Sequence, residues 1–471
     1  MRGDLEAVFS APIMAHAQWG VLVRSLRTGE ILYERNADKL MVPASNMKIV
    51  TLAAAARVLG WDAHFTTTLE SSAPIEDGVL RGDLYVRGGG DPSINTRNGR
   101  GAAVFADWIA ALRSAGIRRI DGRIVGDDNL FDDEGLGAGW AWDYLEADYA
   151  APVGALQYNE DVAALTVLPG RAAGEPAIVS LAPGSGLTVD NRTVTSAAGT
   201  PETIQCRRRM NAPVLEVLGS VPLPAAEPSP LAPVRTVART VAVVNPTAYF
   251  VQSLREALIA GGIAVSGEAV DLDDLPAVAS GNEPARRPLA TTESQPLRDI
   301  AAVMMKVSQN LYAETLLKAT GVAASGAGTA QAGRTAVLET LRQWKLDEGS
   351  LVMLDGSGLS RYDYVTARLI ASLLERLYSD PRHRDAFAAT LAVAGKDGTV
   401  STRLLRTRAE GNARVKTGSI SNMRSLSGYV QSRDGEPLAF AILANDFTIP
   451  AATVNWIAAL AVQILATFAR Q

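Results

Sequence analysis

PASNMK, residues 43–48, is followed by a mostly apolar run at residues 49–59, and together they predict a helix. Ser45 is expected to cap the N-terminus of this helix, and Lys48 falls one turn later on the same face. A serine hydroxyl becomes a good nucleophile when a nearby base takes its proton, and a lysine can be that base if its pKa is lowered. The backbone N–H groups of a helix N-terminus suit a developing oxyanion. Because S-x-x-K is common by chance, this stretch by itself favours an ordinary cap followed by an exposed lysine, and a nucleophilic serine needs support from elsewhere in the chain.

Two further motifs lie far downstream and favour the catalytic interpretation. SQN occupies residues 308–310 and KTGS occupies residues 416–419. S-x-x-K, S-x-N and K-T-G occur together in serine enzymes that react with penicillin. Because all three occur here in that order, chance is a weak explanation for the set.

Lysine is scarce in this chain, which makes its positions informative. The seven lysines compare with 38 arginines, and Lys48 and Lys416 both lie in the motif set. An arginine cannot be deprotonated in a protein and so cannot act as a base. The choice of lysine at these two positions is therefore what proton transfer would require.

Composition excludes several classes of protein. A chain of 471 residues is too long for one hydrophobic core, and its net charge of −5 comes without a long basic block, which argues against a nucleic-acid partner. Cys206 is the single cysteine, so a disulfide framework and a cysteine-based metal cluster are excluded, and no metal or organic cofactor is indicated. No run approaches the roughly 18 apolar residues that span a bilayer. Residues 1–17 are interpreted as the start of the mature fold rather than a signal peptide.

The predicted strands gather at the two ends of the chain. They occupy residues 19–26, 30–34, 413–416, 425–432 and 438–445, with helical patterns between them. This arrangement predicts one antiparallel sheet assembled from both termini, with KTG on one of its strands and facing the Ser45 helix. Because Gly418 has no side chain, we expect a substrate backbone to approach the strand closely at this position. Ser308 and Asn310 fall at a junction within the helical pattern that begins at residue 297.

Between these terminal parts the pattern changes. Residues 66–160 and 240–288 read as an inserted α/β domain, and residues 161–239 as a small mostly-β domain with Pro/Gly turns. Residues 1–65 and 289–471 then form the catalytic domain. The fold class is α+β, with an antiparallel sheet flanked by helices and two smaller inserted domains.

The chain resembles a low-molecular-mass class C penicillin-binding protein, a family of serine D-alanyl-D-alanine carboxypeptidases and endopeptidases. The resemblance covers nearly the whole length and includes several stretches besides the three motifs. These are GGDP at 89–92, AP at 151–152, NLYAE at 310–314, DGSGLS at 355–360 and GKDGT at 395–399. It implies a penicillin-recognising, transpeptidase-like domain with two domains inserted between Lys48 and Ser308.

The resemblance also implies roles for the motif residues. Ser45 would be acylated and Lys48 would accept its proton. Ser308 and Lys416 would pass a proton to the leaving D-alanine, and Asn310 would hold the substrate amide. The terminal carboxylate would be held by Lys416, Thr417 and Ser419 along the strand that contains Gly418. The backbone N–H groups of Ser45 and Ser419 would form the oxyanion hole.

One position departs from the family pattern. Relatives often have an acidic residue where this chain has Tyr144, and that residue helps hold the amino end of a diaminopimelate side chain. Asp143 or Asp148 is expected to compensate, with Arg361 as a carboxylate contact and the segment up to Tyr149 lining the site. The preference for one stem-peptide side chain is therefore left open.

Three functions remain to be compared. The favoured one is a DD-peptidase that trims peptidoglycan stem peptides or cleaves their cross-links and is acylated by β-lactams. The alternatives are a β-lactamase or esterase on the same fold, and a peptidoglycan-binding protein without catalysis. The resemblance implies a periplasmic or extracellular location in the cell envelope, and the sequence does not indicate an oligomeric state.

Overall fold

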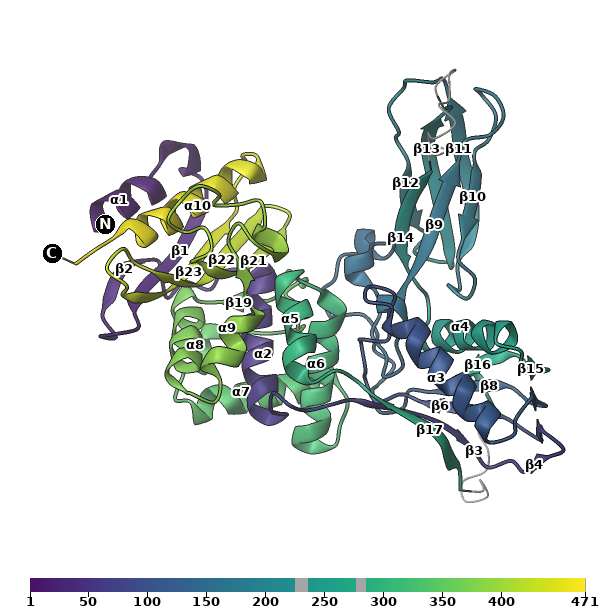
Figure 1. Ribbon diagram of the computed structural model, residues 1–471. Helices are drawn as coiled ribbons and strands as arrows, with labels where there is room; N and C mark the ends of the chain where they lie inside the picture. Colours follow the sequence, from purple (N-terminus) through teal and green to yellow (C-terminus); the bar gives the residue numbers. More distant parts are fainter. Residues whose placement is uncertain (225–235, 277–284, 471) are drawn as a thin grey trace. The chain divides into compact units, whose positions relative to one another are not determined.

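The computed structural model describes residues 1–224, 236–276 and 285–470. The chain forms two compact units, shown in Figure 1. The first unit contains residues 1–64, 137–140 and 295–471, and the second contains residues 65–136 and 141–294. Each unit is described by itself below.

The first unit is built on an antiparallel sheet, as expected from the sequence. Among the described residues its strands run in the order β2-β1-β23-β22-β21-β20. Figure 1 shows purple β1 from the N-terminal part beside yellow-green β23 from the C-terminal part, and the register places Gln18 opposite Asn445 and Ser25 opposite Leu438. The strands are β1 (Gln18–Ser25), β2 (Ile31–Arg35), β20 (Ala392–Val393), β21 (Arg414–Ile420), β22 (Met423–Gln431) and β23 (Pro437–Asn445).

The two faces of this sheet are covered by different helices. Alternate residues such as Val21, Val415 and Phe440 pack with the N-terminal and C-terminal helices in one core. Because side chains alternate along a strand, Lys416 and Gly418 point to the opposite face from Val415. The helices are α1 (Arg2–Phe9), α2 (Met47–Val58), α5 (Leu297–Lys306), α6 (Asn310–Ser325), α7 (Ala330–Gln343), α8 (Ala367–Ser379), α9 (Arg384–Thr390) and α10 (Ala451–Thr467), with a short ribbon of β18 (Leu351–Val352) and β19 (Tyr364–Val365).

Helix α2 is the central helix of the opposite face. All of its first ten residues are buried, which agrees with its apolar sequence on every side. It packs against α6, whose first residue is Asn310. Ser308 lies between the end of α5 and the start of α6, so the expected helix junction is confirmed.

Among the described residues, the second unit contains two large hydrophobic cores and a small cluster of Ala151, Val162 and Ala242. One is formed by the sheet β16-β8-β6-β3-β17 with helices α3 (Arg100–Ser114) and α4 (Pro246–Ala260). The other lies among strands of residues 162–242 and includes Leu165, Val217 and Val241. The strands of the first part are β3 (Thr66–Ser71), β4 (Ile75–Glu76), β5 (Val79–Leu80), β6 (Leu84–Arg87), β7 (Arg119–Ile120), β8 (Ile124–Asp127), β15 (Ala264–Val265), β16 (Ala269–Asp271) and β17 (Arg287–Glu293). Those of the second are β9 (Val162–Leu168), β10 (Ile178–Leu181), β11 (Thr188–Ser196), β12 (Gln205–Arg208), β13 (Val214–Pro222) and β14 (Val237–Ala242).

The expected boundaries of three domains stay a prediction. Across the described ranges, no helix is both long enough and apolar enough to cross a membrane.

Candidate active site

Ser45 lies in a short 3₁₀ turn, η2 (Ala44–Asn46), which leads directly into α2. Several contacts fix this turn against the sheet. Asn46 Nδ2 donates to the Lys416 carbonyl oxygen at 3.1 Å, and Ser425 Oγ donates to the Pro43 carbonyl oxygen at 2.7 Å. Ala44 adopts a φ of +47°, a strained value for a residue with a Cβ. The sheet thus holds the backbone of the candidate nucleophile in place.

The expectation that Ser45 caps the helix is wrong. Asn46 occupies the N-cap position of α2, and no side chain makes a capping hydrogen bond there. The reason is that the 3₁₀ turn continues into α2 with helical backbone angles, so Ser45 is inside the turn and not before it. Its hydroxyl is therefore available for another partner.

That partner is Lys48. Its Nζ donates to Ser45 Oγ at 3.0 Å, to Asn310 Oδ1 at 2.6 Å and to the Ser357 carbonyl oxygen at 2.8 Å. Lys48 is fully buried, whereas Ser45 is partly exposed. Burial lowers the pKa of Lys48 to about 7, against the opposing pull of the Asp355 and Glu314 charges. At neutral pH a large fraction of this amine is neutral and able to accept a proton.

A second lysine and serine form a similar pair. Lys416 Nζ donates to Ser308 Oγ at 2.8 Å and to the Thr417 carbonyl oxygen at 2.7 Å. Burial holds the pKa of Lys416 well below its usual value, and the positive charge of Lys48 lowers it further. Ser308 has a φ of +65°, so its hydroxyl is presented from a strained backbone at the junction of α5 and α6.

Gly418 is needed for a close contact within the chain itself, and its expected role in admitting a substrate backbone stays a prediction. A Cβ at this position would collide with Ser425 Oγ and would lie 2.9 Å from both the Pro43 oxygen and the Ser45 nitrogen. The backbone that approaches β21 closely is therefore the chain's own segment at Ser45. Because Gly418 has no side chain, strand β21 can contact the η2 turn that contains Ser45.

The other residues of KTGS continue along β21. Thr417 is nearly buried, and its Oγ1 shares a hydrogen bond of 2.7 Å with Thr399 Oγ1. Ser419 is exposed. Thr399 belongs to GKDGT, one of the stretches that carry the family resemblance. The sequence alone did not indicate that this stretch lies beside KTG.

Sequence reasoning assigned no role to two buried carboxylates near Lys48, those of Glu314 and Asp355. Glu314 lies one turn after Asn310 on α6 and accepts from the backbone N–H groups of Gly356 and Ser357, at 2.8 Å each. Burial first, and then the charge of Asp355, raise the pKa of Glu314 to about 7. The four-residue spacing of Asn310 and Glu314 was a signal that both face the same side of the helix.

The remaining predicted substrate residues are distributed over both units. Arg361 follows the DGSGLS loop in the first unit and is partly exposed. Asp143, Tyr144 and Tyr149 belong to the second unit, where the rings of Tyr144 and Tyr149 meet edge to face with centroids 5.5 Å apart. Their part in substrate binding stays a prediction.

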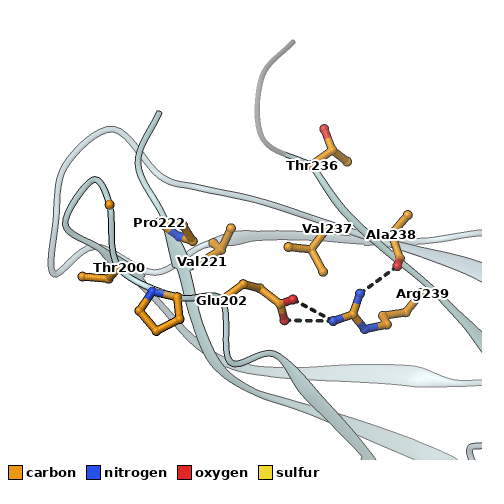
Figure 2. A pocket seen from close by; sticks show the side chains of 10 residues that line it. Thr200, Glu202, Val221, Pro222, Thr236, Val237, Ala238 and Arg239 are labelled. Atoms are coloured by element: carbon orange, nitrogen blue, oxygen red, sulfur yellow. Dashed lines mark hydrogen bonds and ion pairs between the residues drawn. The ribbon is translucent and has the colours of Figure 1, made fainter. Parts of the chain in front are cut away.

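The second unit contains a pocket of about 670 Å³, whose lining side chains are drawn in Figure 2. Arg239 Nη2 donates to both carboxylate oxygens of Glu202, at 2.9 and 2.8 Å, and the lining also includes Thr200, Val221 and Val237. The charges in this pocket already neutralise one another. It contains none of the motif residues, so it does not compete with the Ser45 cluster as the active site.

A cluster of three carboxylates is the group in the described chain that could hold a metal ion. Oxygen atoms of Asp128, Asp271 and Asp273 lie within 4.8 Å of one another in the second unit. Thr247 Oγ1 donates to Asp128 at 2.6 Å, and Asn245 Nδ2 donates to Asp271 at 2.7 Å. Burial raises the pKa of Asp128 to about 6. No nucleophile of the motif set takes part in this cluster.

Comparison with known proteins points to one family. The family described as D-Ala-D-Ala carboxypeptidase 3 (S13) matches residues 1–467. A D-alanyl-D-alanine carboxypeptidase of Actinomadura sp. (strain R39) is 37% identical over 465 residues, covering 96% of this chain and 82% of the relative. The D-alanyl-D-alanine carboxypeptidase DacB of Haemophilus influenzae is 27% identical over 438 residues, covering 91% and 85%.

Solved structures show the same fold. The crystal structure of penicillin binding protein 4 (dacB) from Haemophilus influenzae matches with a TM-score of 0.82 and 24% identity, over 99% of each chain. The Bd3459 endopeptidase of Bdellovibrio bacteriovorus matches with a TM-score of 0.53 and 16% identity, over 95% of this chain and 92% of the other. The α+β class and the penicillin-recognising architecture expected from the motifs are thereby confirmed.

Proposed function

The chain belongs to the D-Ala-D-Ala carboxypeptidase 3 (S13) family, and we propose that it is a serine DD-peptidase whose acyl-enzyme forms on Ser45. The observation that carries this assignment is a fully buried lysine amine 3.0 Å from a partly exposed serine hydroxyl. A binding protein without catalysis would have no need for a desolvated amine at that position. The substrate is the D-alanyl-D-alanine end of a peptidoglycan stem peptide.

The first step is proton transfer from Ser45 Oγ to neutral Lys48 Nζ. The oxygen then attacks the carbonyl carbon of the penultimate D-alanine, and the carbonyl oxygen becomes an oxyanion. The Ser45 N–H, held beside β21 by the Gly418 contact, and the Ser419 N–H would stabilise that charge. Asn310, whose Oδ1 already binds Lys48, would use its amide group to hold the substrate backbone.

The second step is departure of the terminal D-alanine. Its amine leaves as the C–N bond breaks and needs one proton, which Ser308 would deliver and Lys416 Nζ, 2.8 Å away, would replace. Water then hydrolyses the ester: its OH group joins the acyl carbon and its other proton restores the Ser45 hydroxyl. The proton that Lys48 gained returns through solvent to Lys416, so both amines recover their starting states. Lys416 is the side chain of the pair that supplies the proton, and burial holds its pKa well below the usual value, which favours release of that proton.

The substrate carboxylate would bind along β21. Lys416, Thr417 and Ser419 present the amine and hydroxyl groups that such an anion requires. A β-lactam has the same carboxylate and a reactive amide, and would acylate Ser45 in the same way. Stem peptides and β-lactams are therefore the proposed partners, and the cell envelope, either periplasmic or extracellular, is the proposed location.

The test is covalent labelling of the full chain by a fluorescent penicillin, with the adduct located by mass spectrometry. The wild type should carry one label on Ser45 and should release D-alanine from a stem peptide. Ser45→Ala should abolish both, with little change in Tm because the Ser45 side chain caps no helix. A penicillin adduct on a different serine in Ser45→Ala would contradict the assignment.

The lifetime of the adduct separates the remaining alternatives. A DD-peptidase retains the penicilloyl group, whereas a β-lactamase releases it within the catalytic cycle. Rapid loss of label together with no D-alanine release would identify a β-lactamase or esterase. Absence of any covalent label would identify a binding protein.

A further inference from the structure

Asp355 is a fully buried carboxylate at the start of the DGSGLS loop of the first unit. Four donors surround it. Its Oδ1 accepts the Gly358 N–H at 2.6 Å, and its Oδ2 accepts the Ser360 N–H at 2.8 Å, Ser357 Oγ at 3.2 Å and Trp140 Nε1 at 2.8 Å. A buried charge is tolerated only when its hydrogen bonds are made, so this loop is built around the carboxylate.

One peptide unit connects Asp355 to Lys48. The Gly358 N–H that donates to Asp355 belongs to the same peptide as the Ser357 carbonyl, whose oxygen accepts Lys48 Nζ at 2.8 Å. A carboxylate on the N–H side of a peptide polarises it and makes its oxygen a stronger acceptor. The carboxylate therefore both orients this acceptor and strengthens its bond to the amine.

Trp140 holds the other side of the same carboxylate. The segment of residues 137–140 is contained in the first unit although it lies in sequence between two stretches of the second. It fits closely against the loop, because a Cβ on Gly139 would lie 2.6 Å from both Ser360 Oγ and the Tyr362 ring. Replacing the indole N–H would leave Asp355 with one donor fewer and more room to turn.

We propose that Asp355 is a positioning residue for the acylation step. Through the Ser357–Gly358 peptide it aims the carbonyl that binds Lys48 Nζ, and Trp140 keeps Asp355 in that orientation. The proposal rests on the proposed role of Lys48 as the base. Asp355 and Trp140 thus act on Lys48 through the protein and need no contact with the substrate.

The charged groups facing Lys48 determine the direction of the pH effect. They are Asp355 on the loop, Glu314 on α6 and Lys416 on β21, and Asp363 in turn faces Asp355. The charge of Asp355 raises the pKa of Lys48. Removing that charge must lower the pKa, so Lys48 would remain a neutral base down to a lower pH.

The experiment measures the second-order rate constant of acylation by a fluorescent penicillin, on the full-length chain, from about pH 5 to about pH 10. Asp355→Asn should lower the maximum rate by roughly ten- to a hundredfold, because the amine is misplaced. Its acid limb should also move to lower pH than in the wild type. A substitution that only loosened the fold would reduce the labelled fraction without moving the limb.

Trp140→Phe tests the same connection without touching a charge. It should slow acylation several-fold and leave the acid limb in place. Trp108→Phe is the matched control: Trp108 Nε1 donates to Thr292 Oγ1 at 2.7 Å in the second unit, so the same change removes a similar bond away from the motif residues. It should leave both rate and profile unchanged.

Two results would overturn the proposal. One is an Asp355→Asn variant with the wild-type rate and acid limb, and the other is a folded Trp140→Phe variant that acylates as fast as Trp108→Phe. The second result decides the matter even if Asp355→Asn does not fold. If the wild type itself acquired no label on Ser45, the proposed function would fail, whereas wild-type labelling with unchanged variants would reject only the role of Asp355.

Discussion

At the scale of single residues, two buried lysines divide the proton chemistry of the site. Lys48 donates to Ser45 Oγ at 3.0 Å, and Lys416 donates to Ser308 Oγ at 2.8 Å. Neither amine is exposed, and the positive charge of Lys48 disfavours the charged form of Lys416. In the proposed mechanism, Lys48 is thereby the base for Ser45 when the serine attacks. Lys416 is the proton source for Ser308 when D-alanine leaves.

The acylation rate should depend on pH in a defined direction. Burial lowers the pKa of Lys48 to about 7, and only the neutral amine can accept the Ser45 proton. The rate constant should therefore fall as the pH is lowered through about 7 and rise above it. Stopped-flow measurement with a chromogenic β-lactam checks this. A rate that increased on acidification would mean that the cationic form of Lys48 is the active one.

Lys48→Arg should be nearly as damaging as Lys48→Ala, although it preserves the positive charge. A guanidinium does not lose its proton in a protein and so cannot act as the base. Penicillin labelling of both variants measures the effect. Lys396→Arg is the control, because Lys396 is largely exposed and pairs with Glu410 at 3.1 Å. Near-normal acylation by Lys48→Arg would show that Lys48 acts only through its charge.

At the scale of elements, the site depends on how closely β21 approaches the turn that contains Ser45. The turn is tied to the sheet through Asn46 and Pro43, and Val42 is tied to β23 through both side-chain amide atoms of Asn445. Helix α2 then places Lys48 one turn further on. The nucleophile and its base are thus positioned by a strand and a helix that are far apart in the sequence.

Gly418→Ala should disrupt this approach. Its Cβ would collide with Ser425 Oγ and crowd Pro43 and Ser45, so strand and turn must separate. We expect a loss of about 1–3 kcal/mol in the free energy of unfolding and a larger relative loss of acylation rate. Denaturant titration and penicillin labelling measure the two effects. Gly3→Ala is the control, because nothing lies within 4 Å of a Cβ there. Unchanged acylation in Gly418→Ala would contradict the close approach.

At the scale of the whole molecule, the long insertion leaves and re-enters the first unit at neighbouring points. The Leu297 N–H donates to the Ala63 oxygen at 2.8 Å, and the Arg298 N–H donates to the Trp61 oxygen at 3.0 Å. The segments that precede and follow residues 65–294 are therefore hydrogen-bonded to each other. Ser45, Ser308 and Lys416 all lie outside that insertion.

A chain in which a short Gly/Ser linker joins residues 64 and 295 should still be labelled by penicillin. It retains the three motifs but loses Trp140, so its acylation should be about as slow as that of Trp140→Phe. Activity on a stem peptide with a charged side chain should fall further. Labelling rates and D-alanine release measure the two losses. A folded deletion variant that acquires no label would show that the insertion takes part in the chemistry itself.

Tyr144→Asp in the full chain probes the specificity expected of the second unit. It supplies the carboxylate that the family resemblance leads us to expect at this position, and should raise kcat/KM for diaminopimelate-bearing peptides more than for uncharged analogues. Tyr144→Phe is the control, since it removes the hydroxyl without adding charge. Equal effects of Tyr144→Asp on both kinds of peptide would mean that residue 144 does not face the side chain.

The sequence by itself determined the family, the sheet built from both termini and the candidates Ser45, Lys48, Ser308 and Lys416. Short motifs carry this information because chemistry demands particular side chains at helix and strand spacings. The division into three domains stays a prediction.

Only the tertiary structure showed that Ser45 does not cap α2, that Gly418 admits the chain's own backbone, and that Glu314 and Asp355 lie near Lys48. These features depend on contacts between segments hundreds of residues apart. The lowered pKa of Lys48 is a property of its burial among those segments, and local sequence does not encode burial.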